Sequence, residues 1–202
     1  MASQIDIVNR GLSKIGDARI TALSDPTKAA RLAASVYETV RDAEIAAYAW
    51  NFAKTRARLP ADMDKPPFGW ERQYCLPADC LRVLEAGPWP QAVMSDFISD
   101  DTSAFTIEGR HILTNHGPAL NLIYLRRVAD PGFYPPVFIE ALAAKLAVEM
   151  AESLTGSNSK RELAWKEYEQ TVRQARRINA IEKPPQALVD DTWMAARLIG
   201  VI

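Results

Sequence analysis

The sequence predicts an α+β protein: a four-helix bundle with an inserted antiparallel β region and an extended C-terminal arm. Three observations support this prediction. Apolar residues recur at helical spacing toward both ends of the chain, prolines replace that periodicity in the middle, and Pro184-Pro185 precede a final apolar stretch. We therefore assign residues 1–50 and 131–183 to a helical bundle domain, 51–130 to an inserted β domain and 184–202 to the arm.

Length and composition exclude several classes of protein. A chain of 202 residues has room for one domain carrying an insertion, and surface scaling gives about 70% of its surface buried on folding. Its 48% hydrophobic and 24% charged residues are close to globular averages. No apolar run approaches the roughly 20 residues that cross a bilayer. We therefore expect a soluble protein without a membrane partner.

The charge balance and the cysteine count narrow the function further. With 24 Lys and Arg against 25 Asp and Glu, the formal charge of -1 gives the molecule no field that would hold nucleic acid by counterion release. The chain has only 2 cysteines, and residues 1–4 lack the basic and apolar regions of a signal peptide. We expect synthesis in a reduced, intracellular compartment.

The first 50 residues predict two helices. Ser3 is the expected N-cap of the first helix and Gly16 its stop. Its apolar stripe is Ile5, Val8, Leu12 and Ile15. A longer second helix is expected after Asp25-Pro26, because these residues fit a cap followed by proline at the first helical position. Its predicted buried stripe, in alternating steps of four and three, is Ala29, Ala33, Val36, Val40, Ala43 and Ala47.

The middle of the chain predicts β structure, with Glu108-Gly109 as the best signal for a short hairpin. The six candidate strands are Phe52 to Leu59, Arg72 to Leu76, Leu81 to Ala86, Phe105 to Glu108, Arg110 to Thr114 and Leu120 to Arg127. A long connection begins at Gly87 and contains Trp89 and three aspartates. Such connections in compact domains are usually functional or mobile.

Helical patterning returns after residue 135. A helix from Pro136 to Gly156 carries apolar residues around most of its circumference, which predicts a buried helix. Ser159 to Glu162 fits a capping box for a fourth helix. The expected buried stripe of that helix is Trp165, Tyr168, Val172, Ala175 and Ile178.

The C-terminal arm is predicted to be an assembly element. Residues 186–202 are too few to form a core of their own, yet they are rich in apolar side chains. Large aromatic residues dominate interface energetics, so Trp193 is the expected anchor. The alternative is that the arm folds back on its own bundle. The candidate partner-binding residues are Trp193, Met194, Arg197, Leu198 and Ile199.

The motifs of catalysis and of cofactor binding are missing from this sequence. It has no glycine-rich phosphate loop, no nucleophile elbow and no paired-histidine metal signature, so we expect no cofactor and no metal site. Cys75 and Cys80 lack the two further soft ligands that a zinc site needs, and we interpret them as flanking a turn between strands. His111 and His116 are interpreted as strand and turn residues.

Paired carboxylates are the remaining basis for an enzyme, because glycosidases need two such groups in different environments. Glu149 and Glu152 lie three residues apart on the third helix, and Asp190-Asp191 lie in the arm. Solvated helix faces explain such pairs more often, so we expect no enzymatic activity. The basic run of the fourth helix, which predicts a solvated or subunit-contacting face, is Arg173, Arg176 and Arg177.

Four motifs occur in an ordered series over residues 5 to 85. They are Asn9 to Gly16, Ala29 to Tyr37 with Arg41-Asp42 behind it, Trp50 to Ala53, and Tyr74 to Arg82. In this order and with these gaps they resemble the tail tubular protein A family, the head-to-tail adaptor or gatekeeper proteins of tailed bacteriophages. The chain departs from the family at Ala49, where a proline commonly precedes the tryptophan.

The resemblance implies a helical bundle with an inserted β region and a ring of twelve copies beneath the portal protein, at the head–tail junction of the virion. Such a ring, assembled in the host cytoplasm, continues the DNA channel and connects to the tail nozzle or the next tail component. Genomic DNA passes through it without specific binding, which suits a near-neutral chain. The candidate lumen or loop contacts are Trp89, Asp96, Asp100 and Asp101.

Other interpretations stay open at this point. Plain solvation is the simpler explanation of the three loop aspartates. A virion-associated cell-wall or glycan hydrolase is the alternative function, and a regulatory helical binding module is a third.

Overall fold

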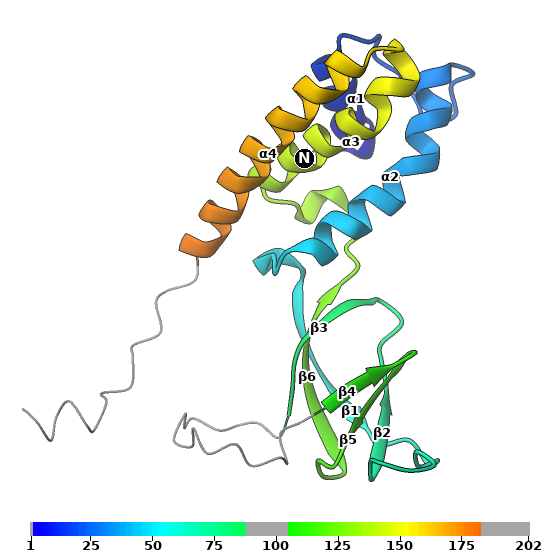
Figure 1. Cartoon of the computed structure of the whole chain (residues 1–202), viewed down its shortest axis with the longest axis vertical. Coiled ribbons are helices and arrows are strands. Elements are labelled where there is room, and N and C mark those ends of the chain that lie inside the picture. Colours follow the sequence, from blue (N-terminus) through cyan, green and yellow to red (C-terminus); the bar gives the residue numbers. More distant parts are fainter. Residues whose placement is uncertain (1, 88–104, 183–202) are drawn as a thin grey trace, which may run out of the picture.

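The computed structural model describes residues 2–87 and 105–182. Within these residues, four α-helices and two three-stranded antiparallel sheets make the chain an α+β protein (Figure 1). The helices lie together at one end of the molecule and the strands at the other. The helices are α1 (Gln4–Ile15), α2 (Lys28–Ala47), α3 (Pro136–Thr155) and α4 (Asn158–Ile181).

The ends of α1 (Gln4–Ile15) are those that the sequence predicts. The Ser3 hydroxyl accepts from the backbone N–H of Asp6, and the Asp6 carboxylate accepts from the backbone N–H of Ser3, which completes a capping box. Gly16 ends the helix in the left-handed region, with φ 73°. Gly11 allows α1 to approach α3 closely, because a Cβ at this position would lie 3.0 Å from the backbone oxygen of Ala143.

The predicted start of α2 is wrong. Thr27, not Asp25, is the N-cap, since its hydroxyl accepts from the backbone N–H of Ala30 at 3.1 Å. The Asp25 carboxylate instead accepts from the backbone N–H groups of Thr21 and Ala22, at 2.8 and 3.0 Å, and so closes the turn before the helix. The side chain within reach of the free backbone N–H groups of α2 is that of Thr27, and threonine is one of the preferred N-cap residues.

The buried face of α2 also differs from the predicted stripe. Ala29, Ala33 and Val40 are buried, but Ala43 and Ala47 are exposed. A row of residues in alternating steps of four and three repeats every seven residues. Because seven residues fall short of two full turns of a straight helix, the row rotates around the helix axis by about 20° per heptad. Over the length of α2 the buried face therefore shifts to a set that includes two charged residues: Tyr37, Arg41, Glu44 and Ile45.

The third helix is the centre of the helical part. The other three helices all pack against α3, which agrees with the predicted buried helix. Leu142 and Phe138 are fully buried, and so are the small residues that let neighbours approach. The buried residues of α3 are Phe138, Ile139, Ala141, Leu142, Ala143, Ala144, Leu146, Ala147, Val148, Met150 and Ala151. Gly156 ends the helix with φ 63°, as predicted.

Two predictions for α4 are wrong. Its N-cap is Ser157, whose hydroxyl accepts from the backbone N–H of Lys160, so Ser159 and Glu162 do not form the cap. Trp165 is 44% exposed, because the buried row runs through Ala164 and Tyr168 and leaves the tryptophan one position beyond its edge. The buried residues of the helix are Ala164, Tyr168, Val172, Ala175 and Asn179.

The middle of the chain forms two small sheets with strand orders β1-β6-β3 and β2-β5-β4. The strands are β1 (Lys54–Pro60), β2 (Arg72–Cys75), β3 (Cys80–Gly87), β4 (Phe105–Glu108), β5 (His111–Thr114) and β6 (Ala119–Arg126). All six predicted strands are present within two residues of their expected ends. The hairpin between β4 and β5 is also confirmed, with Gly109 at φ 58° and Glu108 paired with His111.

Each part of the molecule has its own hydrophobic core. The helical core includes residues from all four helices and the end of β6. The β core is much smaller and consists of Leu59, Tyr74, Ile112, Leu120, Leu122 and Tyr124. Between the two, Trp50 and Phe52 stack with Phe138 at ring-centroid distances of 5.1 and 4.7 Å. These rings fix the helical part to the segment that enters β1.

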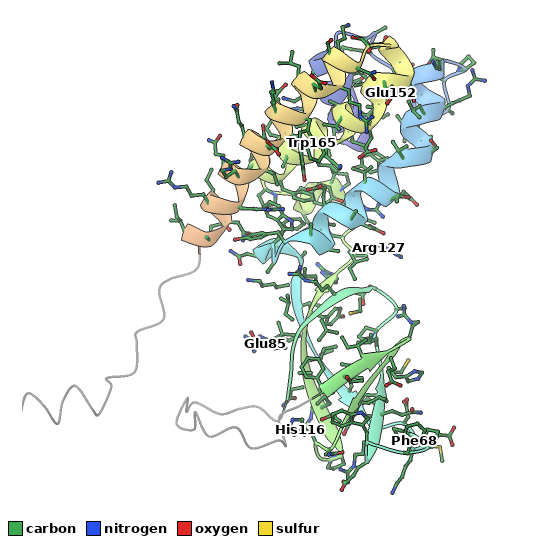
Figure 2. The ribbon with its side chains drawn as sticks, in the orientation of Figure 1. Phe68, Glu85, His116, Arg127, Glu152 and Trp165 are labelled. Carbon is green, nitrogen blue, oxygen red and sulfur yellow. The ribbon has the colours of Figure 1, made fainter. Side chains whose placement is uncertain are left out.

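An ion pair makes a second connection between the two parts. The Asp42 carboxylate of α2 accepts from Arg127 Nε at 2.7 Å, just after β6, and from Arg41 Nε at 2.8 Å. Figure 2 shows Arg127 where the helices meet the strands. The Asp79 carboxylate accepts from the Tyr124 hydroxyl at 3.1 Å and thereby fixes the start of β3 to β6.

Candidate functional site

Of the carboxylates weighed for catalysis, Glu149 and Glu152 lie on a solvated, ion-paired helix face, and Asp190-Asp191 lie outside the described residues. Glu149 Oε1 is 2.8 Å from Lys145 Nζ, and Glu152 Oε2 is 2.8 Å from Arg161 Nη1. Both glutamates are exposed residues. Each of these two carboxylates thus has its own cation.

The cysteines flank the connection from β2 to β3, as the sequence predicts. Cys75 is exposed and ends β2, and Cys80 begins β3. Burial, aided by the negative charge of Asp79, raises the pKa of the Cys80 thiol, which makes it a poorer nucleophile at neutral pH. Among the described residues, no group of three or more His, Cys, Asp or Glu side chains is arranged to hold a metal ion.

The histidines belong to the β part. His111 Nε2 lies 3.5 Å from Asp62 Oδ2, and both side chains are partly exposed. His116 is buried, and its backbone oxygen accepts from the Tyr74 hydroxyl at 3.1 Å and from Arg72 at 3.1 Å. Figure 2 shows His116 near the distal end of the strands. The backbone of His116 therefore supports the turn before β6.

The residues predicted to contact partners lie outside the described residues. This holds for Trp193, Met194, Arg197, Leu198 and Ile199 of the arm. It holds equally for the loop residues Trp89, Asp96, Asp100 and Asp101. The candidate surfaces below come from the remainder of the chain.

A buried polar cluster joins α2, α3 and α4, and sequence reasoning did not find it. Glu44 is only 4% exposed, and its Oε1 accepts from the Tyr168 hydroxyl at 2.7 Å. Its backbone oxygen accepts from Trp50 Nε1 at 2.8 Å. Lys145 Nζ lies 5.4 Å from the centre of the Tyr168 ring, and the Arg176 guanidinium lies 5.4 Å from that of Tyr48. The cluster fixes the position of α4 against α2.

The electrostatics of this cluster follow from burial. Desolvation raises the pKa of the Glu44 carboxyl, while the Tyr168 hydrogen bond and the charges of Lys145 and Arg176 oppose this rise. The negative charge of Glu149 also raises the pKa of the Glu44 carboxyl. Oε2 of Glu44 and Nε of Arg176 are buried and have no hydrogen-bond partner among the described residues. The two surface hollows described next are lined by other residues, so we assign the cluster a positioning role.

The first hollow lies on the outer face of α4 and has a volume of about 630 Å³. We call it the α4 hollow; its lining residues are Asn158, Arg161, Glu162, Trp165 and Lys166. These positions are spaced i, i+3, i+4, i+7 and i+8, so they share one face of the helix. The same spacing in the sequence is the signal that predicts this face. The expectation that Trp165 is buried hides this face.

The second hollow, of about 370 Å³, lies where the end of α2 meets the first sheet. Its lining residues are Ala49, Lys54, Thr55, Arg56, Leu84, Glu85 and Ile123. Its charged groups are of both signs, and Glu85 extends outward from the sheet in Figure 2. The charged lining residues are two bases, Lys54 and Arg56, and one acid, Glu85.

The connection between β1 and β2 carries large apolar side chains in water. We call residues 61–71 the β tip. Met63 is 101% exposed and Phe68 is 87% exposed. Figure 2 shows Phe68 at the end of the β part farthest from the helices. In the sequence, the signal for a turn here is Pro66-Pro67-Phe68-Gly69. Gly69 adopts φ 83°, which turns the chain.

Comparisons with known proteins do not assign a function to this chain. No protein-family model matches this chain, and no curated protein matches it in sequence. In the described part of the chain, none of the helices has both the length and the apolar character that crossing a bilayer requires.

Proposed function

We propose that this protein is a structural head-to-tail adaptor of a tailed bacteriophage. In this role twelve copies form a ring beneath the portal protein, continue the DNA channel and connect to the tail nozzle or the next tail component. The observation that carries the proposal is the ordered series of residues between 5 and 85 that resembles the tail tubular protein A family. The protein would act by contact alone, with no reaction to catalyse.

The members of that series make contacts on which the fold depends, which supports a relationship in structure. Asn9 in α1 donates to the backbone oxygen of Ile20 and accepts from the backbone N–H of Ile20, so it holds the linker after the helix. Asp42 joins α2 to Arg127, and Trp50 joins α2 to α3 by donating to the backbone oxygen of Glu44 and packing on Phe138.

The outer surface of α4 supports a ring built from unlike faces. Arg173 and Arg177 are exposed there beside Glu169 and Lys166. Arg176 departs from the predicted basic run, because it turns inward over Tyr48. A ring requires heterologous contacts, in which one face of each copy packs on a different face of the next. A charged, ordered helix surface is suited to one side of such a contact.

The finer architecture belongs to the same proposal. The four helices would act as one bundle that docks beneath the portal, and residues 51–130 would act as an inserted domain directed toward the tail. Residues 186–202 would bind the portal or the neighbouring copy, with Trp193 as the anchor. Their apolar content supports this, since a solubilising tail has no need of it.

Imaging of the purified protein mixed with its portal protein tests the proposal. We expect a closed ring of copies on the portal, aligned with the channel. A single bound copy, or no ring, would contradict it. Isolated protein is not a substitute for this experiment, since a portal template can supply order that solution lacks.

Deletion of residues 186–202 tests the role of the arm. We expect the thermal midpoint of the monomer to stay nearly unchanged while loading onto portals fails. A fall of several degrees would instead show that the arm packs on its own helices. Loading of the truncated protein with full affinity would show that the arm is not the assembly element.

A further inference from the structure

One face of β1 carries a row of bases. Lys54, Arg56 and Arg58 occupy alternate positions of the strand, so their side chains share one face of the first sheet. The residues between them point the other way, since Ala57 and Leu59 pack in the β core. We call Lys54, Arg56 and Arg58 the basic row. It lies on the outer face of the sheet and extends out of the second hollow.

The two arginines of the basic row have no counter-charge in the described part of the chain. Both are exposed, and neither forms an ion pair with a carboxylate there. Lys54 Nζ donates to Asn51 Oδ1 at 3.0 Å, and this amide is neutral. Across β6, the register places one acid, Glu85, and one more base, Arg82, level with the row. Four bases against one acid suit an anionic partner.

Helix α4 ends beside this face. Nδ2 of Asn51, just before β1, donates to the backbone oxygen of Asn179 at 2.7 Å and to Glu182 Oε2 at 3.3 Å. Figure 1 shows the ends of α2 and α4 on the same side of the molecule. The chain therefore leaves α4 next to Lys54 and the second hollow, with residues 183–202 still to follow.

The segment that follows α4 has the complementary charge. Its charged residues between 184 and 196 are Asp190 and Asp191, and the nearest bases on either side are Lys183 and Arg197. An extended chain from the end of α4 to Asp190 spans up to about 26 Å, twice the roughly 13 Å length of the basic row. Both acids are therefore within reach of the row of their own chain. The tether gives this contact a high effective concentration.

We propose that residues 183–192 lie across the basic row of their own chain, with Asp190 and Asp191 paired to Arg56 and Arg58. Residues 193–202 then stay available to the portal or the neighbouring copy. The contact rests on the proposed role of the arm and specifies how the arm is positioned. Exposed ion pairs add little stability, so deletion of the arm should still leave the thermal midpoint nearly unchanged.

Crosslinking within the isolated full-length chain tests the contact. In a background with Cys75 and Cys80 replaced by serine, Thr192→Cys is combined with Glu85→Cys on the sheet or, as the control, with Lys166→Cys on α4. The control site lies about 24 Å along α4 from its end, which an extended segment of about 33 Å also reaches.

We expect a short bismaleimide to form the intramolecular product at least about five times faster with the sheet site than with the control site, in dilute protein. Equal rates at the two sites would overturn the inference. So would a product that joins only two different chains, because the arm would then dock on another copy.

Charge reversal tests the ion pairs themselves. The pair Arg56→Glu and Arg58→Glu should slow the crosslink to the sheet roughly fivefold, and so should the pair Asp190→Arg and Asp191→Arg. All four substitutions together should recover most of the rate, because the charges are opposite again. Absence of recovery in the fourfold variant would overturn the pairing.

A matched reversal elsewhere controls for net charge. Arg173→Glu with Arg177→Glu changes the same number of exposed arginines on α4 and should leave the crosslinking rate unchanged. Salt at about 1 M should slow the wild-type pairing, because it screens exposed charges beyond about 3 Å. Equal effects of the two arginine pairs, or a rate that ignores salt, would count against the contact.

The two proposals fail in different ways. Absence of the intramolecular product in isolated protein would overturn this contact and leave the adaptor function intact, since no portal takes part. Protein that shows the contact and never forms a ring on the portal would overturn the adaptor function and leave the contact intact.

Discussion

The helical and β parts of this molecule differ in which side chains they bury and which they expose to water. The helical part buries residues of all four helices around α3, together with the charged groups Glu44 and Arg41. The β part has a core of six buried residues and places Met63 and Phe68 in water. The two tasks therefore fall to different parts of the molecule. The large helical core stabilises the fold, and the small β core supports the exposed β tip.

The largest expected effect is at the connection of the two parts. Trp50→Ala removes a buried ring that packs on Phe138 and donates to Glu44, and it should cost about 4 kcal/mol, or about 10 °C in thermal midpoint. Trp165→Ala, the same change at a half-exposed site, is the control and should cost much less. Equal losses in thermal denaturation would contradict the assigned burial.

A matched pair of core leucines tests whether the two parts open separately. Leu142 in α3 and Leu120 in β6 are both 0% exposed, so either alanine substitution should cost about 2 to 5 kcal/mol. Hydrogen exchange should show faster opening confined to residues 54–126 in Leu120→Ala, and throughout the described helices in Leu142→Ala. Identical exchange patterns would show that the parts open as one unit.

The buried carboxyl of Glu44 gives a pH-dependent effect of intermediate size. Because its pKa is raised in the folded state, the folded protein holds this proton more tightly than the unfolded one. Its contribution to stability is therefore present below the ordinary value of 4.5 and is lost as pH rises through the folded pKa. Glu44→Gln should remove that loss and raise the thermal midpoint at pH 7 relative to wild type.

The partner of Glu44 provides the control for this measurement. Tyr168→Phe removes the hydroxyl that donates to Glu44 and should cost about 1 to 3 kcal/mol at neutral pH, since a buried acceptor loses its donor. The loss should be smaller at low pH, where the carboxyl is protonated. A Glu44→Gln variant whose midpoint follows the wild-type pH profile would show that Glu44 does not titrate in this way.

The smallest effects are expected on the ion-paired face of α3. Glu149→Gln and Glu152→Gln each remove one exposed pair and should change the free energy of unfolding by less than about 1 kcal/mol. Any glycan hydrolysis in a preparation should also survive both changes within a few-fold. A fall by orders of magnitude in a folded variant would support the hydrolase alternative.

Local patterns in the sequence predict the elements of this fold well. The six strands, the Ser3 cap of α1 and the glycine ends of α1 and α3 depend on residues close together in the chain. Their hydrogen-bonding and backbone preferences act over a few residues, so a single sequence displays them. The candidate surfaces were predicted less well, since the α4 hollow depends on Trp165 being exposed.

The sequence by itself therefore determined the order of the helices and strands and placed the strand ends within two residues, with errors at the caps of α2 and α4. Only the tertiary structure decided which face of α2 is buried, that Glu44 meets Tyr168 and that Trp165 reaches solvent. Glu44 and Tyr168 are separated by 124 residues. No local preference encodes such a pair, because the packing of α2 and α4 on α3 brings it together.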